Sequence, residues 1–118
     1  MILLIDDSGF ARAMIRKRLE AAGFQDFIEA DNGKKALRLF KKHNPRLVLL
    51  DIVLGPPITG LDTLRQIMEL DKDAKVMIVS VMEQKNIIAR AKKLGAVCFV
   101  PKSGDLNDLI KAVKVALR

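Results

Sequence analysis

The chain has 118 residues, and half of them are hydrophobic, which is enough for one domain with a substantial core. Its 21 Lys and Arg residues exceed the 14 Asp and Glu residues, giving a formal net charge of +7 that suits either a solvated basic surface or an acidic partner. A single cysteine, Cys98, excludes an internal disulfide and a thiolate metal cluster. No apolar run has the length of a membrane span and no secretory signal pattern is present, so we expect one cytoplasmic domain over residues 1–118.

Apolar runs and helical repeats alternate along the first half of the chain. In chain order, the expected elements are a strand at 2–5, a helix at 8–22, a strand at 27–30, a helix at 34–43 and a strand at 47–50. Ser8 is suited to cap the first helix and Gly23 to end it. The second helix is strongly basic, which indicates either a solvated face or a docking surface for an acidic partner.

The same alternation continues after a loop that contains Pro56 and Pro57. The expected elements are a helix at 61–70, a strand at 76–79, a helix at about 87–94, a strand at 97–100 and a helix at about 106–117. Three methionines at core spacings, together with Cys98, are expected to be buried: Met14, Met68 and Met77. Strands that alternate with helices predict a parallel sheet covered by helices on both faces.

The composition of the strands predicts their order in the sheet. The first, third and fourth strands are wholly apolar, as expected for central strands buried on both faces. Glu29 in the second strand and Pro101 at the end of the fifth suit edge positions. We therefore expect an α/β fold, a flavodoxin-like doubly wound five-stranded parallel sheet of order 2-1-3-4-5 with five helices.

Polar residues follow the strands at the points where the strands end. The residues concerned are Asp6, Asp7, Asp51, Ser80 and Lys102. Because parallel strands end at one edge of the sheet, these side chains should converge where the strand order reverses, which is where ligands bind in such folds. Three carboxylates suit a hard divalent cation, with Mg²⁺ the best match. Acids that favour a helix N-terminus would explain one carboxylate, but not the whole set.

These residues, with the opening "DDSGFAR", resemble the receiver domain of response regulators over the full chain, particularly chemotaxis-type and other single-domain receivers. The resemblance implies that Asp51 is the phosphoacceptor. It also implies that Asp6, Asp7, Asp51 and the backbone carbonyl of Val53 hold Mg²⁺. The hydroxyl of Ser80 would contact the phosphoryl group.

The same resemblance implies that Lys102 pairs with the phosphoryl group, and that Ser80 and Phe99 form the switch. The chain would then be a two-component signalling phosphoprotein, not an enzyme, apart from weak self-phosphorylation from small donors and slow self-dephosphorylation. Its partners would be a histidine kinase or phosphotransfer protein and a downstream target protein, with no direct binding of nucleic acid. It would act as a monomer or as a phosphorylation-dependent dimer.

Four positions depart from the usual receiver pattern. Gly60 comes about one residue late, which predicts a small insertion in the loop "IVLGPPITG" after Asp51. Val81 replaces a small residue and could narrow the path to Asp51, and Ser103 stands where receivers often have a proline after the lysine. Phe99 lacks the hydroxyl of the commoner tyrosine.

Two other side chains are expected beside the phosphoryl group. Val53 and Met82 cannot position a water molecule by hydrogen bonding, which predicts a long-lived phosphorylated state.

Two alternative functions remain open. A phosphatase or phosphomutase with an aspartate nucleophile would need an acid at the position of Val53 and a cap domain. A phosphorylation-independent basic binding module with a vestigial acidic pocket is the remaining alternative. Without tyrosine or tryptophan, this module would lack stacking residues for nucleic acid.

Overall fold

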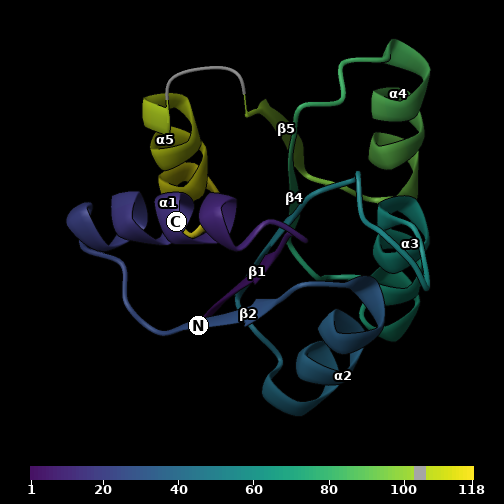
Figure 1. The fold of residues 1–118 in the computed structure, drawn as a ribbon, viewed down its shortest axis with the longest axis horizontal. Helices are drawn as coiled ribbons and strands as arrows, with labels where there is room; N and C mark the ends of the chain where they lie inside the picture. Colours follow the sequence, from purple (N-terminus) through teal and green to yellow (C-terminus); the bar gives the residue numbers. More distant parts are fainter. Residues whose placement is uncertain (103–105) are drawn as a thin grey trace.

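Five parallel strands form one sheet in the order β2-β1-β3-β4-β5 in the computed structural model, which describes residues 1–102 and 106–118 (Figure 1). The strands are β1 (Ile2–Ile5), β2 (Phe27–Ala30), β3 (Leu47–Leu50), β4 (Val76–Ser80) and β5 (Cys98–Pro101). Ile5 lies opposite Ala30 on one side and Leu50 on the other. The predicted order is confirmed, with Glu29 and Pro101 on the two edge strands.

Helices cover both faces of this sheet. They are α1 (Gly9–Ala21), α2 (Gly33–His43), α3 (Gly60–Leu70), α4 (Lys85–Leu94) and α5 (Leu106–Ala116). Figure 1 shows α1 and α5 together on one side, and α2, α3 and α4 on the other. The layered α/β arrangement is therefore the doubly wound, flavodoxin-like fold that the sequence predicts.

Side chains of the central strands alternate between two hydrophobic clusters, because successive residues of a strand point to opposite faces. In β1, Leu3 and Ile5 pack on the side of α2, α3 and α4, whereas Ile2 and Leu4 pack on the side of α1 and α5. All four residues of β1 and of β3 are buried. This burial explains why the central strands are continuously apolar.

Helix boundaries follow from capping residues. The side chains of Ser8, Asn32 and Thr59 accept hydrogen bonds from backbone N–H groups in the first turns of α1, α2 and α3. Gly95 ends α4 with a φ of 121°, a conformation that favours glycine. The Ser8 cap is confirmed, and the helix stop at Gly95 is confirmed as well.

Some details differ from the sequence predictions. Met14 is 45% exposed and not in the core, because Ile15 and Leu19 form the buried face of α1. Met77 is fully buried. Cys98 is partly buried on the side of α1 and α5, and this burial raises the pKa of its thiol despite the nearby Lys92 charge.

Two strand ends are displaced from the predicted positions by one residue. Ser80 is the last residue of β4 and pairs with Pro101, so both belong to the sheet ladder and do not follow it. Ser103, expected where receivers often have a proline, lies outside the described residues.

Across the described ranges, 1–102 and 106–118, no helix is both long and apolar enough to cross a bilayer.

Candidate functional site

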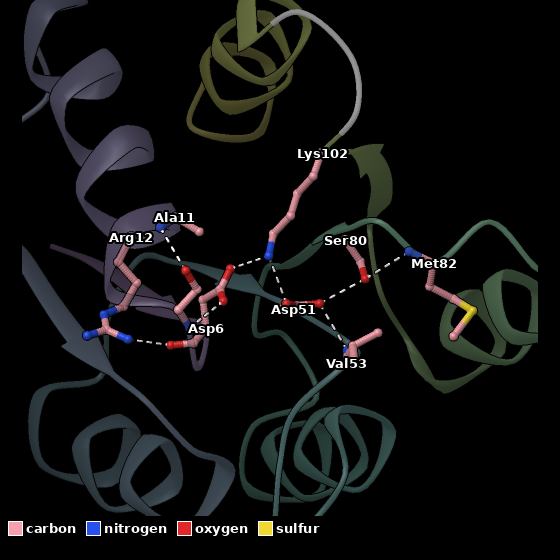
Figure 2. A network of polar contacts seen from close by, with 9 residues as sticks. Asp6, Ala11, Arg12, Asp51, Val53, Ser80, Met82 and Lys102 are labelled. Carbon is pink, nitrogen blue, oxygen red and sulfur yellow. Dashed lines mark hydrogen bonds and ion pairs between the residues drawn. The ribbon is translucent and has the colours of Figure 1, made fainter.

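The carboxyl edge of the sheet gathers four of the polar residues singled out from the sequence. Asp6 follows β1, Asp51 follows β3, Ser80 ends β4 and Lys102 follows β5. Figure 2 shows Lys102 reaching from the end of β5 to a point between Asp6 and Asp51. The convergence arises because all five strands are parallel, so their carboxyl ends share one edge.

The carboxylate of Asp51 lies at the centre of this group and is buried, with a relative exposure of 5%. Its Oδ1 accepts hydrogen bonds from the hydroxyl of Ser80 at 2.8 Å and from the backbone N–H of Val53 at 2.9 Å. Its Oδ2 accepts a hydrogen bond from Nζ of Lys102 at 2.8 Å. Donors from three different segments therefore fix the orientation of this carboxylate, which helps to preorganise a nucleophile.

Lys102 connects Asp51 to Asp6. Its Nζ lies 2.5 Å from Oδ2 of Asp6 and 2.8 Å from Oδ2 of Asp51. Burial lowers the pKa of the Lys102 ammonium, but hydrogen bonds and charges from Asp51 and Asp6 outweigh this effect and raise the pKa above its ordinary value. Lys102 is therefore a cation at neutral pH and supplies a fixed positive charge to the site.

Three carboxylates form an acidic cluster around this ammonium. Oxygens of Asp6, Asp7 and Asp51 all lie within 4.8 Å of one another. Asp6 and Asp51 are buried, whereas Asp7 is exposed and accessible to a ligand. With a single ammonium among them, three carboxylates leave an excess of two negative charges. Because Mg²⁺ is divalent and prefers oxygen ligands, the donor set and its charge fit this ion.

A partly buried arginine supports the segment that carries the two N-terminal acids. Nη1 of Arg12 donates a hydrogen bond to the backbone carbonyl of Asp6, and Nε lies 2.9 Å from the carboxylate of Glu29. Arg16 also pairs with Glu29, at 3.0 Å. The sequence analysis interprets Glu29 only as a sign of an edge strand and does not predict these ion pairs. A charged residue within a strand is usually paired, and this is the signal that could have predicted them.

The expected switch residues lie on β4 and β5. The Ser80 hydroxyl oxygen accepts a hydrogen bond from the backbone N–H of Met82 at 3.2 Å, in addition to its own donation to Asp51. Phe99 lies opposite Ile78 in the sheet and is partly buried against the cluster on the side of α2, α3 and α4. Val81 is 61% exposed.

The part played by Val53 differs in one respect from what its sequence position indicates. Its backbone N–H donates to Asp51, whereas only its carbonyl was expected to take part in the site. A two-residue side-chain-to-backbone hydrogen bond of this kind is common for aspartate in a turn, so the signal was present in the sequence. Val53 is 45% exposed beside the phosphoacceptor candidate.

The fold places the protein in a class of α/β domains that bind ligands at the carboxyl edge of a doubly wound sheet. Within this class, the family described as the response regulator receiver domain matches residues 2–114. The chain belongs to this family, and is thus a receiver domain of two-component signal transduction. Receiver domains are generally phosphoacceptors and not true enzymes, and they bind Mg²⁺ at an acidic pocket.

Individual proteins show the same similarity over nearly the whole chain. Chemotaxis protein CheY of Bacillus subtilis is 34% identical over 116 residues, which are 98% of this chain and 96% of the relative. Sporulation initiation phosphotransferase F of the same organism is 32% identical over 113 residues, 96% of this chain and 90% of the relative. The crystal structure of the CheX-CheY-BeF3-Mg+2 complex from Borrelia burgdorferi contains a chain with a TM-score of 0.91 and 29% identity, with 99% of this chain and 88% of that chain covered.

Proposed function

We propose that Asp51 accepts a phosphoryl group from the phosphohistidine of a histidine kinase or phosphotransfer protein. An oxygen of Asp51 attacks phosphorus, the phosphorus–nitrogen bond of the donor breaks, and its electron pair returns to the imidazole. The product is an acyl phosphate. The observation that carries this proposal is the buried Asp51 carboxylate, which is oriented by Ser80, Val53 and Lys102 at 2.8 to 2.9 Å.

Mg²⁺ is the cofactor that this proposal requires. Asp6, Asp7, Asp51 and the backbone carbonyl of Val53 would hold the ion, which supplies positive charge where phosphoryl oxygens approach the carboxylates. Lys102 supplies a second positive charge. In the structure its ammonium is shared between Asp6 and Asp51, and it pairs with a phosphoryl oxygen once Asp51 is modified.

Phosphorylation would act on the rest of the molecule through Ser80. At present the Ser80 hydroxyl donates to Asp51, and a phosphoryl oxygen on Asp51 provides a new acceptor farther from β3. Ser80 moves toward this acceptor and Phe99 turns into the vacated space. The surface formed by α4, β5 and α5 then changes and controls binding of a downstream target protein.

The proposal covers residues 1–118 as a single cytoplasmic receiver domain that signals through protein partners. Its oligomeric state would be a monomer or a phosphorylation-dependent dimer. The CheX-CheY-BeF3-Mg+2 complex from Borrelia burgdorferi is an example of a CheY-like chain bound to a protein.

The test is phosphorylation by a small donor. Wild-type protein and Asp51→Asn are incubated with acetyl phosphate, with and without Mg²⁺, and weighed intact. We expect the wild-type mass to rise by one phosphoryl group only with Mg²⁺, and the Asp51→Asn mass to stay unchanged. Circular dichroism confirms that the variant is folded. Absence of any gain in folded wild-type protein would contradict the proposal and favour a phosphorylation-independent binding module.

A further inference from the structure

We propose that the basic face of α2 is a docking surface for an acidic segment of a partner protein that carries an apolar side chain among its carboxylates. The basic face is defined by Lys34, Leu37, Arg38, Lys41 and Lys42. This inference goes beyond the phosphoacceptor function and does not depend on Asp51.

Part of the charge on α2 is unfavourable for the helix itself. Its 11 residues include five Lys and Arg residues and no acidic residue. Arg38 lies one turn from both Lys34 and Lys42, and like charges at this spacing repel each other. Lys34 also lies in the first turn, where the helix dipole disfavours a cation. Lys41 and Lys42 lie in the last turn, where the dipole favours cations. The charges of Lys34 and Arg38 are the part that helix stability does not explain, which indicates a role outside the fold.

Two arginines of other helices are neutralised by carboxylates of the protein. In α1, Arg16 lies within ion-pair distance of Glu20 and Glu29. In α3, Arg65 pairs with Glu69 at 2.7 Å. Within residues 1–102 and 106–118, no Lys or Arg of α2 has an ion pair with the protein. The four Lys and Arg residues of α4 also have none within these ranges, so charge alone does not distinguish α2, and its case depends on the groove described next.

The basic face also contains a groove, and one of the residues that line this groove is apolar. A groove of about 510 Å³ is lined by the five residues of this face. Leu37 is partly buried and packs against the core, whereas Arg38 and Lys41 are exposed. A second hollow of about 290 Å³ shares Leu37 and Lys41 and extends to Leu70 of α3, which is 47% exposed. The second hollow is also lined by Glu69, so only the groove at Leu37 is bordered by cations alone. Leu37 and its cations match a peptide with one apolar side chain bordered by carboxylates.

A protein segment fits this surface better than nucleic acid does. The chain has no tyrosine or tryptophan on which bases could stack. From Lys34 to Lys42 the row of cations spans about 12 Å, at about 1.5 Å per residue of helix. Contact with a phosphate backbone would leave Leu37 and Leu70 without apolar partners.

The position of α2 separates this surface from the phosphoacceptor site. Figure 1 shows α2 beside β2, and β2 is at the opposite edge of the sheet from β5. A partner anchored on α2 leaves the acidic cluster and the α4-β5-α5 surface accessible. Charge changes on α2 are therefore expected to leave phosphorylation by acetyl phosphate unchanged.

The experiment measures binding of a fluorescent peptide with a repeated Glu-Glu-Leu-Glu sequence by anisotropy at low ionic strength. The test variant is Arg38→Glu/Lys42→Glu. The matched control is Lys17→Glu/Arg118→Glu, which gives the same net charge through two exposed residues outside α2. We expect the test variant to weaken peptide binding about tenfold or more, and the control to weaken it no more than about twofold.

Two further probes identify the ligand chemistry. A peptide in which serine replaces each leucine should bind more weakly than the leucine peptide, because it cannot use Leu37. A duplex DNA of random sequence should bind less tightly than the leucine peptide. If the DNA binds more tightly than the leucine peptide, and with the same dependence on Arg38 and Lys42, the proposal is overturned and nucleic acid is the ligand of this surface. Equal weakening by the two double variants, or no binding by wild type, would overturn the proposal. Unchanged circular dichroism and acetyl phosphate reactivity establish that each variant is folded.

Discussion

We expect Val53 and Met82 to control how well water can reach Asp51 once it is phosphorylated. Val53 is 45% exposed beside Asp51, and the backbone of Met82 contacts Ser80. Neither side chain can hold a water molecule in line with phosphorus by a strong hydrogen bond. We therefore expect slow hydrolysis of the acyl phosphate.

Introducing a polar side chain at either position should shorten the lifetime of the phosphorylated state. We expect Val53→Asn and Met82→Glu each to speed loss of the phosphoryl group by about tenfold, the effect of one well-placed hydrogen bond. The measurement is intact mass against time after the donor is removed. Val115→Asn, at an exposed position on α5, is the control. Unchanged decay in both variants would show that these side chains do not limit hydrolysis.

Arg12 is expected to contribute more to stability than other paired arginines. Its side chain is 19% exposed, pairs with Glu29 and donates to the carbonyl of Asp6. Arg12→Ala leaves both acceptors without this partner, so we expect the free energy of unfolding to fall by about 2 kcal/mol. Urea denaturation followed by circular dichroism measures the change.

The matched control is Arg65→Ala on α3. Arg65 pairs with Asp62 and Glu69, but its side chain is 48% exposed. Exposed ion pairs contribute little, so this variant should change the free energy of unfolding by no more than about 0.5 kcal/mol. Similar effects of Arg12→Ala and Arg65→Ala would mean that the contact with Asp6 adds nothing to the ion pair.

At the scale of the elements, the junction between β3 and α3 depends on a close approach of two backbones. A Cβ added at Gly60 would lie 2.3 Å from the carbonyl oxygen of Ile52, which also accepts a hydrogen bond from the Gly60 N–H at 3.2 Å. Backbone atoms cannot yield as a flexible side chain can. Gly60 therefore fixes where α3 begins relative to the loop that follows Asp51.

Gly60→Ala should consequently lower stability and disturb the site. We expect a loss of about 2 kcal/mol or more in the free energy of unfolding, as for other overpacked positions, and slower phosphorylation by acetyl phosphate. Gly55→Ala is the control within the same loop, because nothing lies within 4 Å of a Cβ added there. The interpretation fails if the two variants have equal stability in urea.

The same elements show what the sequence could and could not reveal. Apolar runs, capping residues and strand-end acids predicted the order of the sheet and the meeting of Asp6, Asp51 and Lys102, because these features depend on periodicity and on parallel strands. The contact of Arg12 with Glu29 was missed because it joins residues 17 positions apart on different elements. The exposure of Met14 was missed because its burial depends on how α1 is rotated against the sheet.

At the scale of the whole molecule, the two proposed surfaces occupy different parts of the fold. The acidic cluster lies at the carboxyl edge of the sheet, and the cations of α2 lie on a helix beside the β2 edge. The proposed switch residues, Ser80 on β4 and Phe99 on β5, lie at the other side of the sheet from β2. Phosphorylation should therefore alter one side of the molecule and leave the other unchanged.

Hydrogen exchange with and without beryllofluoride, a phosphoryl mimic, tests this division. In the presence of Mg²⁺, we expect the mimic to change hydrogen exchange in α4, β5 and α5, because Ser80 and Phe99 move together. Peptides from α2 should exchange at the same rate in both states and serve as an internal reference. Asp51→Asn, which cannot form the acyl phosphate mimic, should show no change anywhere. A crystal structure that places Phe99 in one position with and without the mimic would rule out this switch, even if Asp51 is phosphorylated.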